Sequence, residues 1–221
     1  MLIVCKIFIY YIIYSFLGWM MEVGLCLVKE HKFVNRGFLI GPVCPIYGRG
    51  VLLIVFLIDG NKSDILSVFL KSIFICSILE YTTSFVMEKM FHARWWDYSN
   101  RRFNINGRIC LETMIPFGIL GSLVILFVHP FIVNLISKLN SNFIIIIGII
   151  FMVLYLIDNF ISFNVMSKIK NEIKRHDIDS TEIIRKKVIN WLSNNTVLFR
   201  HIVSAFPKFK IISRMMKWIR K

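Results

Sequence analysis

The sequence predicts an all-α fold: a polytopic bundle of about five transmembrane helices, followed by a basic amphipathic helical tail. Hydrophobic residues make up 57% of the 221 positions and charged residues 18%, and the mean hydropathy is +0.67. Soluble domains are about 45–50% apolar and about 25% charged. The excess apolar surface must face lipid, since a core of this size cannot bury it. A soluble enzyme and a disordered chain are therefore excluded.

Five apolar stretches approach the length of about 20 residues that a spanning helix needs. They are Ile7–Val28, Pro42–Ile58, Ile65–Met87, Leu111–Ile136 and Phe143–Val165. The first has no small-residue cleavage site and is expected to be an uncleaved span. The second is the shortest and carries several Gly and Pro residues. The fourth begins near Glu112 and is expected to break at Pro116.

The distribution of basic residues predicts the orientation. With five spans, 23 of the 27 Lys and Arg residues fall on one side, in the first and third connections and in the tail. Arg49 is counted with the first connection. Cytoplasmic segments carry the excess of basic residues in membrane proteins. We therefore expect the N-terminus outside and the C-terminus in the cytoplasm.

The tail, residues 166–221, differs in composition from the bundle, residues 1–165. From Lys168 onward it holds fourteen basic and four acidic residues. One apolar stripe follows Asp179. A second, around Ile211 and Met215, lies on the opposite side of its helix from basic residues, a pattern typical of a helix lying on anionic lipid. A partner-binding helix is the alternative. Nucleic acid is not an expected partner, because no nucleic-acid motif accompanies the charge.

A shift of 66 residues aligns part of the chain with itself. Between residues 21–44 and 87–110 it gives five identities, among them Glu22 with Glu88 and Cys44 with Cys110. A span–loop–span unit used twice, at residues 7–58 and 65–136, would explain the match, with 143–165 as an added fifth span. Chance remains the alternative for so weak a repeat.

Ionisable residues inside spans are candidate pathway residues, because burying them in lipid is costly. Glu22, Glu80 and Asp158 lie within spans, whereas Glu88 and Glu112 lie near a boundary and could simply be solvated. Helical spacing places Tyr14, Gly18 and Glu22 on one face, and Glu80, Ser84 and Glu88 on another. We expect these faces to meet inside the bundle.

The opposing charges lie in the connections. We expect Arg36, Arg94 and Arg108 to pair with Glu22, Glu80 or Glu88, and Asp97 to join this substrate-binding or pathway group. Four aromatic residues are expected at the interface with the headgroups: Trp19, Trp95, Trp96 and Tyr98. The Gly and Pro residues of these loops suit re-entrant backbone buried in protein.

The five cysteines form no C-x-x-C pair and are expected to be reduced, apolar residues. No metal site, cofactor or catalytic residue is expected. The chain also lacks the G-x-x-x-x-G-K-[ST] motif, so any ATPase would be a separate subunit.

Several segments together resemble a known family. They are residues 14–22, 33–48, 79–89, 94–99 (Arg-Trp-Trp-Asp-Tyr-Ser) and 104–111 (Asn-Ile-Asn-Gly-Arg-Ile-Cys-Leu). This pattern resembles the ABC-transporter type IV permease (CmpB-like) family of bacterial membrane proteins, over about residues 10–165. The resemblance implies a multi-pass permease of the bacterial plasma membrane, working with a separate ATP-binding subunit. A homo-oligomer is possible. The alternatives are a membrane-embedded enzyme, or an assembly or sensor protein, acting on lipid or cell-envelope components.

Overall fold

The computed structural model describes residues 1–58, 64–91, 93–175 and 210–211. Its helices are α1 (Leu2–Glu30), α2 (Pro45–Leu57), α3 (Ile65–Phe91), α4 (Leu111–Leu123), α5 (His129–Ser137) and α6 (Ser141–Arg175), with the π-helix η1 (Val124–Val128) between α4 and α5. Short strands are β1 (Ala93–Arg94), β2 (Asn104–Ile105), β3 (Ile109–Cys110) and β4 (Lys210–Ile211).

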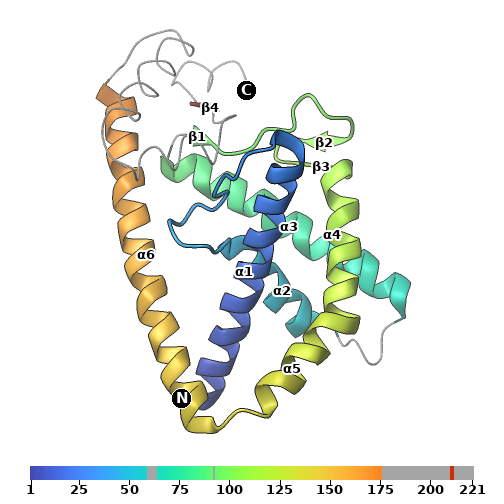
Figure 1. The fold of residues 1–221 in the computed structure, drawn as a ribbon. Coiled ribbons are helices and arrows are strands. Elements are labelled where there is room, and N and C mark those ends of the chain that lie inside the picture. Colours follow the sequence, from blue (N-terminus) through green and yellow to red (C-terminus); the bar gives the residue numbers. More distant parts are fainter. Residues whose placement is uncertain (59–63, 92, 176–209, 212–221) are drawn as a thin grey trace.

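Four helical segments in the described part of the chain are long and apolar enough to cross a membrane: 2–30, 65–91, 111–137 and 141–168. They confirm a multi-pass membrane protein that is predominantly helical. We call the end that carries β2 and β3 the hairpin end, and the opposite end, where α1 begins, the N-terminal end (Figure 1).

The second apolar stretch forms a shorter helix than the others. Helix α2 has 13 residues, or about 20 Å, against about 30 Å of hydrocarbon. The preceding segment 31–44 covers the missing distance, because it turns back from the hairpin end into the bundle (Figure 1). The Cys44 amide donates to the Ser15 carbonyl oxygen at 2.9 Å, about halfway along α1. The second of the five expected spans is therefore not a full-length helix in the structure, which has four long apolar helical segments and here combines non-helical chain with a short helix.

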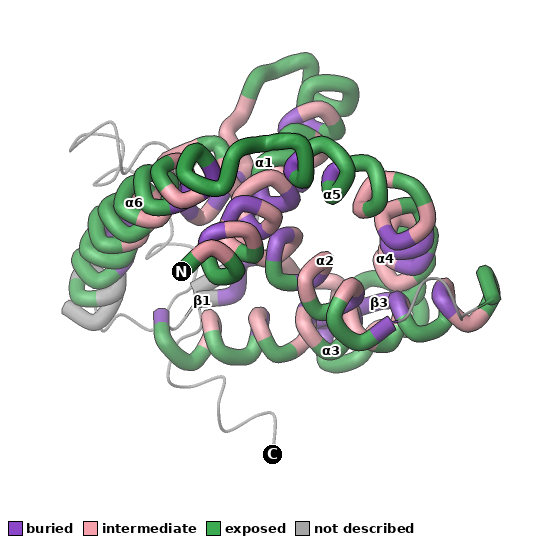
Figure 2. Tube along the Cα trace, turned by 90° about the horizontal axis from the view of Figure 1, so that it is seen from below, coloured by how far each residue is buried: buried purple, intermediate pink, exposed green. Residues whose placement is uncertain are grey.

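Small residues let this crossing pack tightly on α1. A Cβ at Gly18 would lie 2.3 Å from the Tyr47 ring, and one at Gly48 would lie 2.2 Å from Ser15 Oγ. Close approach through small residues is typical of membrane helices, which gain little from hydrophobicity. Figure 2 shows buried residues mainly where helices lie close together, and exposed residues mainly on the outer sides of the helices.

The expected break at Pro116 is wrong. Pro116 lies inside the continuous helix α4, and the irregularity falls at η1, directly before Pro130. A proline lacks an amide hydrogen, and its ring clashes with the carbonyl four residues earlier, here that of Leu126. Widening the helix to a π turn relieves this conflict.

At the hairpin end, β2 pairs with β3 and β1 pairs with β4, both antiparallel. Helix α6 continues to Arg175, past the expected boundary at residue 165. The tail helices expected from the sequence lie outside the described residues, except that Lys210 and Ile211 form β4. Cys44 and Cys110, matched by the weak repeat, each directly precede a helix, α2 and α4.

Candidate functional site

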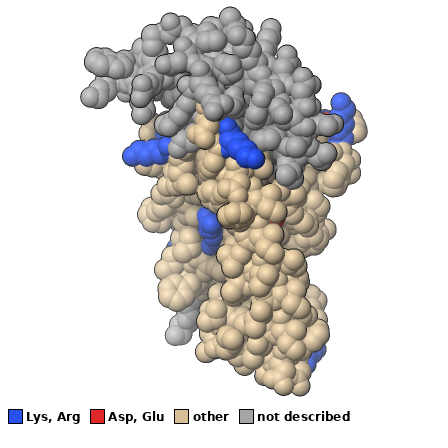
Figure 3. Space-filling model, turned by 90° about the vertical axis from the view of Figure 1, so that its left-hand side faces the viewer, with Lys and Arg blue, Asp and Glu red and all other residues tan. Residues whose placement is uncertain are grey.

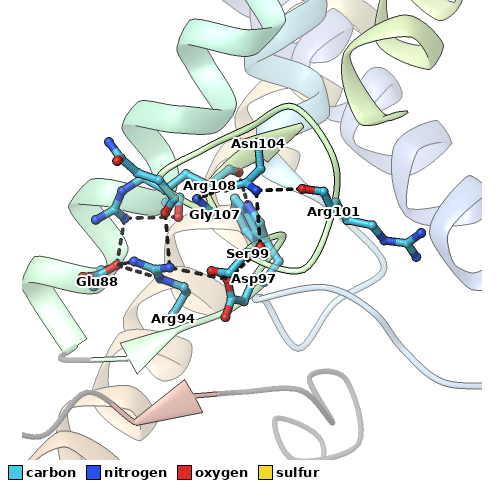
Figure 4. Close-up of polar contacts among 11 residues, drawn as sticks. Glu88, Arg94, Asp97, Ser99, Arg101, Asn104, Gly107 and Arg108 are labelled. Carbon is cyan, nitrogen blue, oxygen red and sulfur yellow. Dashed lines mark hydrogen bonds and ion pairs between the residues drawn. The ribbon is translucent and has the colours of Figure 1, made fainter. Parts of the chain in front are cut away.

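Two buried arginines converge on one carboxylate at the hairpin end, between α3 and the hairpin loop (Figure 4). Arg94 approaches Glu88 Oε2 through Nε and Nη2, both at 3.0 Å. Arg108 Nη1 lies 2.8 Å from the same oxygen. The side chains of Arg94 and Arg108 are only 4% and 9% exposed. The expected pairing is thus confirmed for these two arginines, with Glu88 as their shared partner.

The loop that carries the arginines is shaped by its own polar residues. Asp97 Oδ1 accepts from the Ser99 amide at 3.0 Å and lies 3.5 Å from Arg94 Nη1. Gly107 has φ +65°, a left-handed conformation that favours glycine. A Cβ there would lie 2.4 Å from Ser99 Oγ and 2.7 Å from Asp97 Oδ1. The arginine cluster therefore depends on glycine at this turn.

Glu80 and Glu22 are held by hydroxyl groups. Tyr98 donates to Glu80 Oε1 at 3.2 Å, Thr113 donates to Glu80 Oε2 at 3.5 Å, and Tyr47 donates to Glu22 Oε1 at 2.5 Å. Glu80 is 5% exposed. No ion pair links either carboxylate to an arginine within the described part of the chain. The expected arginine partners are therefore replaced there by neutral donors.

Tyr98 lies in the hairpin loop and donates its hydroxyl to Glu80 of α3. Burial raises its pKa above the usual tyrosine range, and the charges of Glu80 and Glu22 raise it further. The phenol consequently stays protonated and donates to Glu80. Glu22 reaches Tyr47 of α2, whereas Glu80 reaches the hairpin loop and α4, so a direct meeting of the polar faces of α1 and α3 stays a prediction.

Asp158 anchors the entering segment. Its two carboxylate oxygens accept from the Ile40 amide at 3.0 Å and the Gly41 amide at 2.9 Å. Ser162, one turn along α6, donates to Oδ1 at 3.1 Å. A carboxylate on α6 thus satisfies backbone groups that have no helical partner, as buried non-helical chain requires.

The other predicted residues lie apart from these contacts. Arg36 pairs with Glu30 at 3.4 Å, instead of with Glu22, Glu80 or Glu88. Glu112 pairs with Arg101 at 3.0 Å, with both side chains more than half exposed.

The four predicted aromatic residues all contact protein. Trp19 donates to Asn35 Oδ1 at 2.6 Å, and Trp96 donates to the Arg108 carbonyl oxygen at 3.0 Å. Trp95 is 4% exposed and packs edge-on against Phe38. Tyr98 reaches Glu80, as described above. Their polar atoms and rings are used to hold loops in place.

The structure corrects the assignment of Arg49 and shows tyrosine contacts that the sequence did not predict. Arg49 lies on α2 within the spanning region, near the Tyr11 hydroxyl. Tyr11 and Tyr155 join hydroxyl to hydroxyl at 2.6 Å. Tyr14 lies 2.7 Å from His129 Nδ1. An intramembrane arginine was visible in the sequence, but its nearness to Gly and Pro residues suggested a loop.

Among the described residues, no group of three His, Cys, Asp or Glu side chains could hold a metal ion. The arrangement instead combines a short second helix, buried carboxylates held by hydroxyls, and an arginine cluster at one end. Such groups can bind and release protons or charged solutes inside a membrane.

Comparison with known proteins agrees with this architecture. No curated protein and no solved structure matches the chain. A family model described as "Putative ABC-transporter type IV" matches residues 9–163, which include every spanning helix up to the hairpin-end part of α6 and all the carboxylates discussed above. The chain is therefore a member of this ABC-transporter type IV family.

Proposed function

We propose that the chain is the permease subunit of a transporter, and that a separate ATP-binding subunit drives it. The family supports a transport role, and the discontinuous second crossing is the observation that carries the proposal. Transporters bind substrates near the bilayer midplane where a helix is interrupted, because the freed backbone groups and the helix end become available there. Here α2 begins at mid-depth, beside Ser15 of α1.

The pathway we propose passes the polar interior between α1, α2 and α3. Glu22 and Glu80 provide charge, while Tyr47, Tyr98 and Thr113 provide hydroxyl groups. The cluster of Glu88, Arg94, Asp97 and Arg108 closes this interior at the hairpin end. Asp158 holds segment 31–44 against α6 and so sets where α2 starts.

The orientation that we propose has the N-terminus outside the cell and the hairpin end in the cytoplasm. The basic residues around the hairpin end support it, even with Arg49 removed from the count. A membrane-impermeant maleimide applied to intact cells should label Lys138→Cys, and should label Arg102→Cys only after permeabilisation. The reverse pattern would refute this orientation. Both positions are exposed.

Co-purification is the first test of the function. Full-length protein isolated from its native membrane in mild detergent should bring down a subunit that hydrolyses ATP. Vesicles that contain the complex, supplied with a small-molecule cell extract, should accumulate or release a compound in an ATP-dependent manner, detected by mass spectrometry.

Two variants of α3 connect that test to the structure. Glu80→Gln should abolish the flux while the ATPase subunit stays bound. Thr82→Val is the matched control, since Thr82 is exposed and its hydroxyl bonds only to its own helix, at the Ile78 and Leu79 carbonyl oxygens. A chain that brings down no ATPase and causes no ATP-dependent change in any compound would refute the proposal.

A further inference from the structure

Arg49 lies near the middle of the spanning region. Its neighbour Gly48 contacts Ser15 and the Tyr11 backbone of α1. Tyr11 is the tenth residue of α1, about 14 Å from the start of the helix and thus about half of the hydrocarbon thickness. An arginine at this depth is costly unless it has a partner or reaches water.

Two tyrosines assemble beside Arg49. Its guanidinium lies near the Tyr11 hydroxyl, which joins the Tyr155 hydroxyl of α6 at 2.6 Å. We call Arg49, Tyr11 and Tyr155 the Arg49 cluster. It draws one residue from each of α1, α2 and α6, so the fold itself assembles it from distant parts of the chain.

The Arg49 cluster has more hydrogen-bond donors than acceptors. A guanidinium carries five N–H donors and no acceptor, and each phenol carries one donor. The contact between the two hydroxyls uses one phenolic hydrogen. Within the described part of the chain, most guanidinium donors and one phenolic donor have no further acceptor. Hydrocarbon offers no acceptor, so the cluster requires oxygen atoms from elsewhere.

The positive charge also lacks a partner in the described part of the chain, where no carboxylate lies within ion-pair distance of Arg49. Asp158 is one turn from Tyr155 on α6, but its oxygens accept from the Ile40 and Gly41 amides and from Ser162. Glu22 accepts from Tyr47. The positive end of the α2 dipole, at Pro45 one turn away, adds to the potential.

The Arg49 cluster is accessible from the side of the molecule. Arg49 is exposed, although its level in the bundle is that of the apolar spans. Figure 3 shows Lys or Arg atoms at mid-height on the side of the molecule where α6 lies, surrounded by residues other than Lys, Arg, Asp and Glu. A ligand that lies in the bilayer can therefore reach this level laterally.

We propose that the Arg49 cluster binds the anionic oxygen group, a carboxylate or a phosphate, of an amphiphile that enters from the bilayer. The fork of the guanidinium matches two oxygens of such a group. The free phenolic donor supplies a further hydrogen bond, and the alkyl part of the ligand lies against the apolar surface around the cluster.

The test measures binding to the full-length chain in phosphatidylcholine nanodiscs at alkaline pH. The probe is spin-labelled stearic acid, whose immobilised fraction is read from its EPR spectrum, and its methyl ester is the uncharged control. The wild-type chain should immobilise the acid in preference to the ester. Arg49→Gln should weaken binding of the acid about tenfold, and Arg49→Lys less, because lysine keeps the charge but loses the fork.

Two more variants keep the result interpretable. Tyr155→Phe preserves the edge-on ring packing on Phe8 and Tyr11 and should weaken binding of the acid about threefold. Arg36→Gln removes the same charge from the exposed pair with Glu30 and should leave binding unchanged.

Three results would overturn the proposal: no preference for the acid in the wild type, an unchanged preference in Arg49→Gln, or an equal loss in Arg36→Gln. Displacement of the acid by millimolar inorganic phosphate would overturn the assignment to an amphiphile, since it would show an aqueous anion site. The experiment measures binding without transport, so its failure is separate from any failure of the permease proposal.

Discussion

Replacing Glu88 by Gln should destabilise the chain strongly, because it leaves two buried guanidinium groups facing each other. Both arginines converge on the same Glu88 oxygen, and neither is more than 9% exposed. Removing one partner of a buried ion pair costs about 3–5 kcal/mol. Asp97 stays near Arg94, so the low end, about 3 kcal/mol, applies. For a chain of this length that amounts to a fall of about 6–12 °C in Tm.

The measurement is thermal unfolding of purified full-length protein in detergent, followed by intrinsic tryptophan fluorescence. Glu112→Gln is the matched control, because Glu112 pairs with Arg101 at the same 3.0 Å but both side chains are more than half exposed. Exposed pairs contribute about 0–1 kcal/mol. The Tm of Glu112→Gln should therefore fall by less than about 4 °C.

A double variant tests whether the loss of stability in Glu88→Gln comes from the buried arginines. Adding Arg108→Met to Glu88→Gln removes one of the two cations that lose Glu88, and Arg108 packs against the Tyr81 and Phe85 rings that a methionine can also contact. The double variant should regain part of the lost stability. Equal Tm losses for Glu88→Gln and Glu112→Gln, with no recovery in the double variant, would show that burial of the arginines is not what makes Glu88 necessary.

Three further predictions follow from the loops. Asp158→Ala should release segment 31–44, so that the buried Cys44 reacts faster with maleimide, as measured by peptide mapping. Asn159→Ala is the control and should leave the reaction rate of Cys44 unchanged, because the Asn159 amide donates to the Tyr155 carbonyl oxygen of its own helix. Gly107→Ala should lower the free energy of unfolding by at least about 1–2 kcal/mol for its left-handed backbone alone, while Gly24→Ala, with open space around it, should be neutral or slightly stabilising. The pKa of Tyr98 is raised in the folded chain, so from about pH 10 upward the unfolded chain loses this proton while the folded chain keeps it, and the free energy of unfolding falls with rising pH. Tyr98→Phe should make that fall shallower by about 1.4 kcal/mol per pH unit in alkaline unfolding. An unchanged slope would contradict the burial of this phenol.

The spans could be read from the sequence because apolarity over about 20 residues is a local property. Helical spacing likewise placed Glu80, Ser84 and Glu88 on one face, and the structure has Arg108 contacting both Ser84 and Glu88. Which arginine meets which carboxylate depends on loop geometry. Arg36 remains beside Glu30, six residues away, because the chain turns inward directly after it.

Arg49 shows where a count along the chain fails. Along the sequence, Arg49 falls with the first connection because Gly and Pro residues surround it. In the structure, Pro45 begins a helix, a favoured position for proline, and Gly48 allows contact with α1. The residues that suggested a loop are therefore those that start α2 at mid-depth and press it against its neighbour.

The second crossing depends on its neighbours for its hydrogen bonds, which makes α6 the element most able to move it. The amides of Ile40 and Gly41 bond to Asp158 of α6, whereas the amide of Cys44 bonds to Ser15 of α1. Helix α6 contacts α1 near the N-terminal end, where a Gly148 Cβ would lie 2.7 Å from Cys5, and diverges toward the hairpin end. A tilt of α6 about that contact would pull on Ile40 and Gly41 while Cys44 stayed fixed to α1. The strain would fall on residues 42–43, directly before α2 and the Tyr47–Glu22 contact, so we expect a movement of α6 to change the surroundings of Glu22.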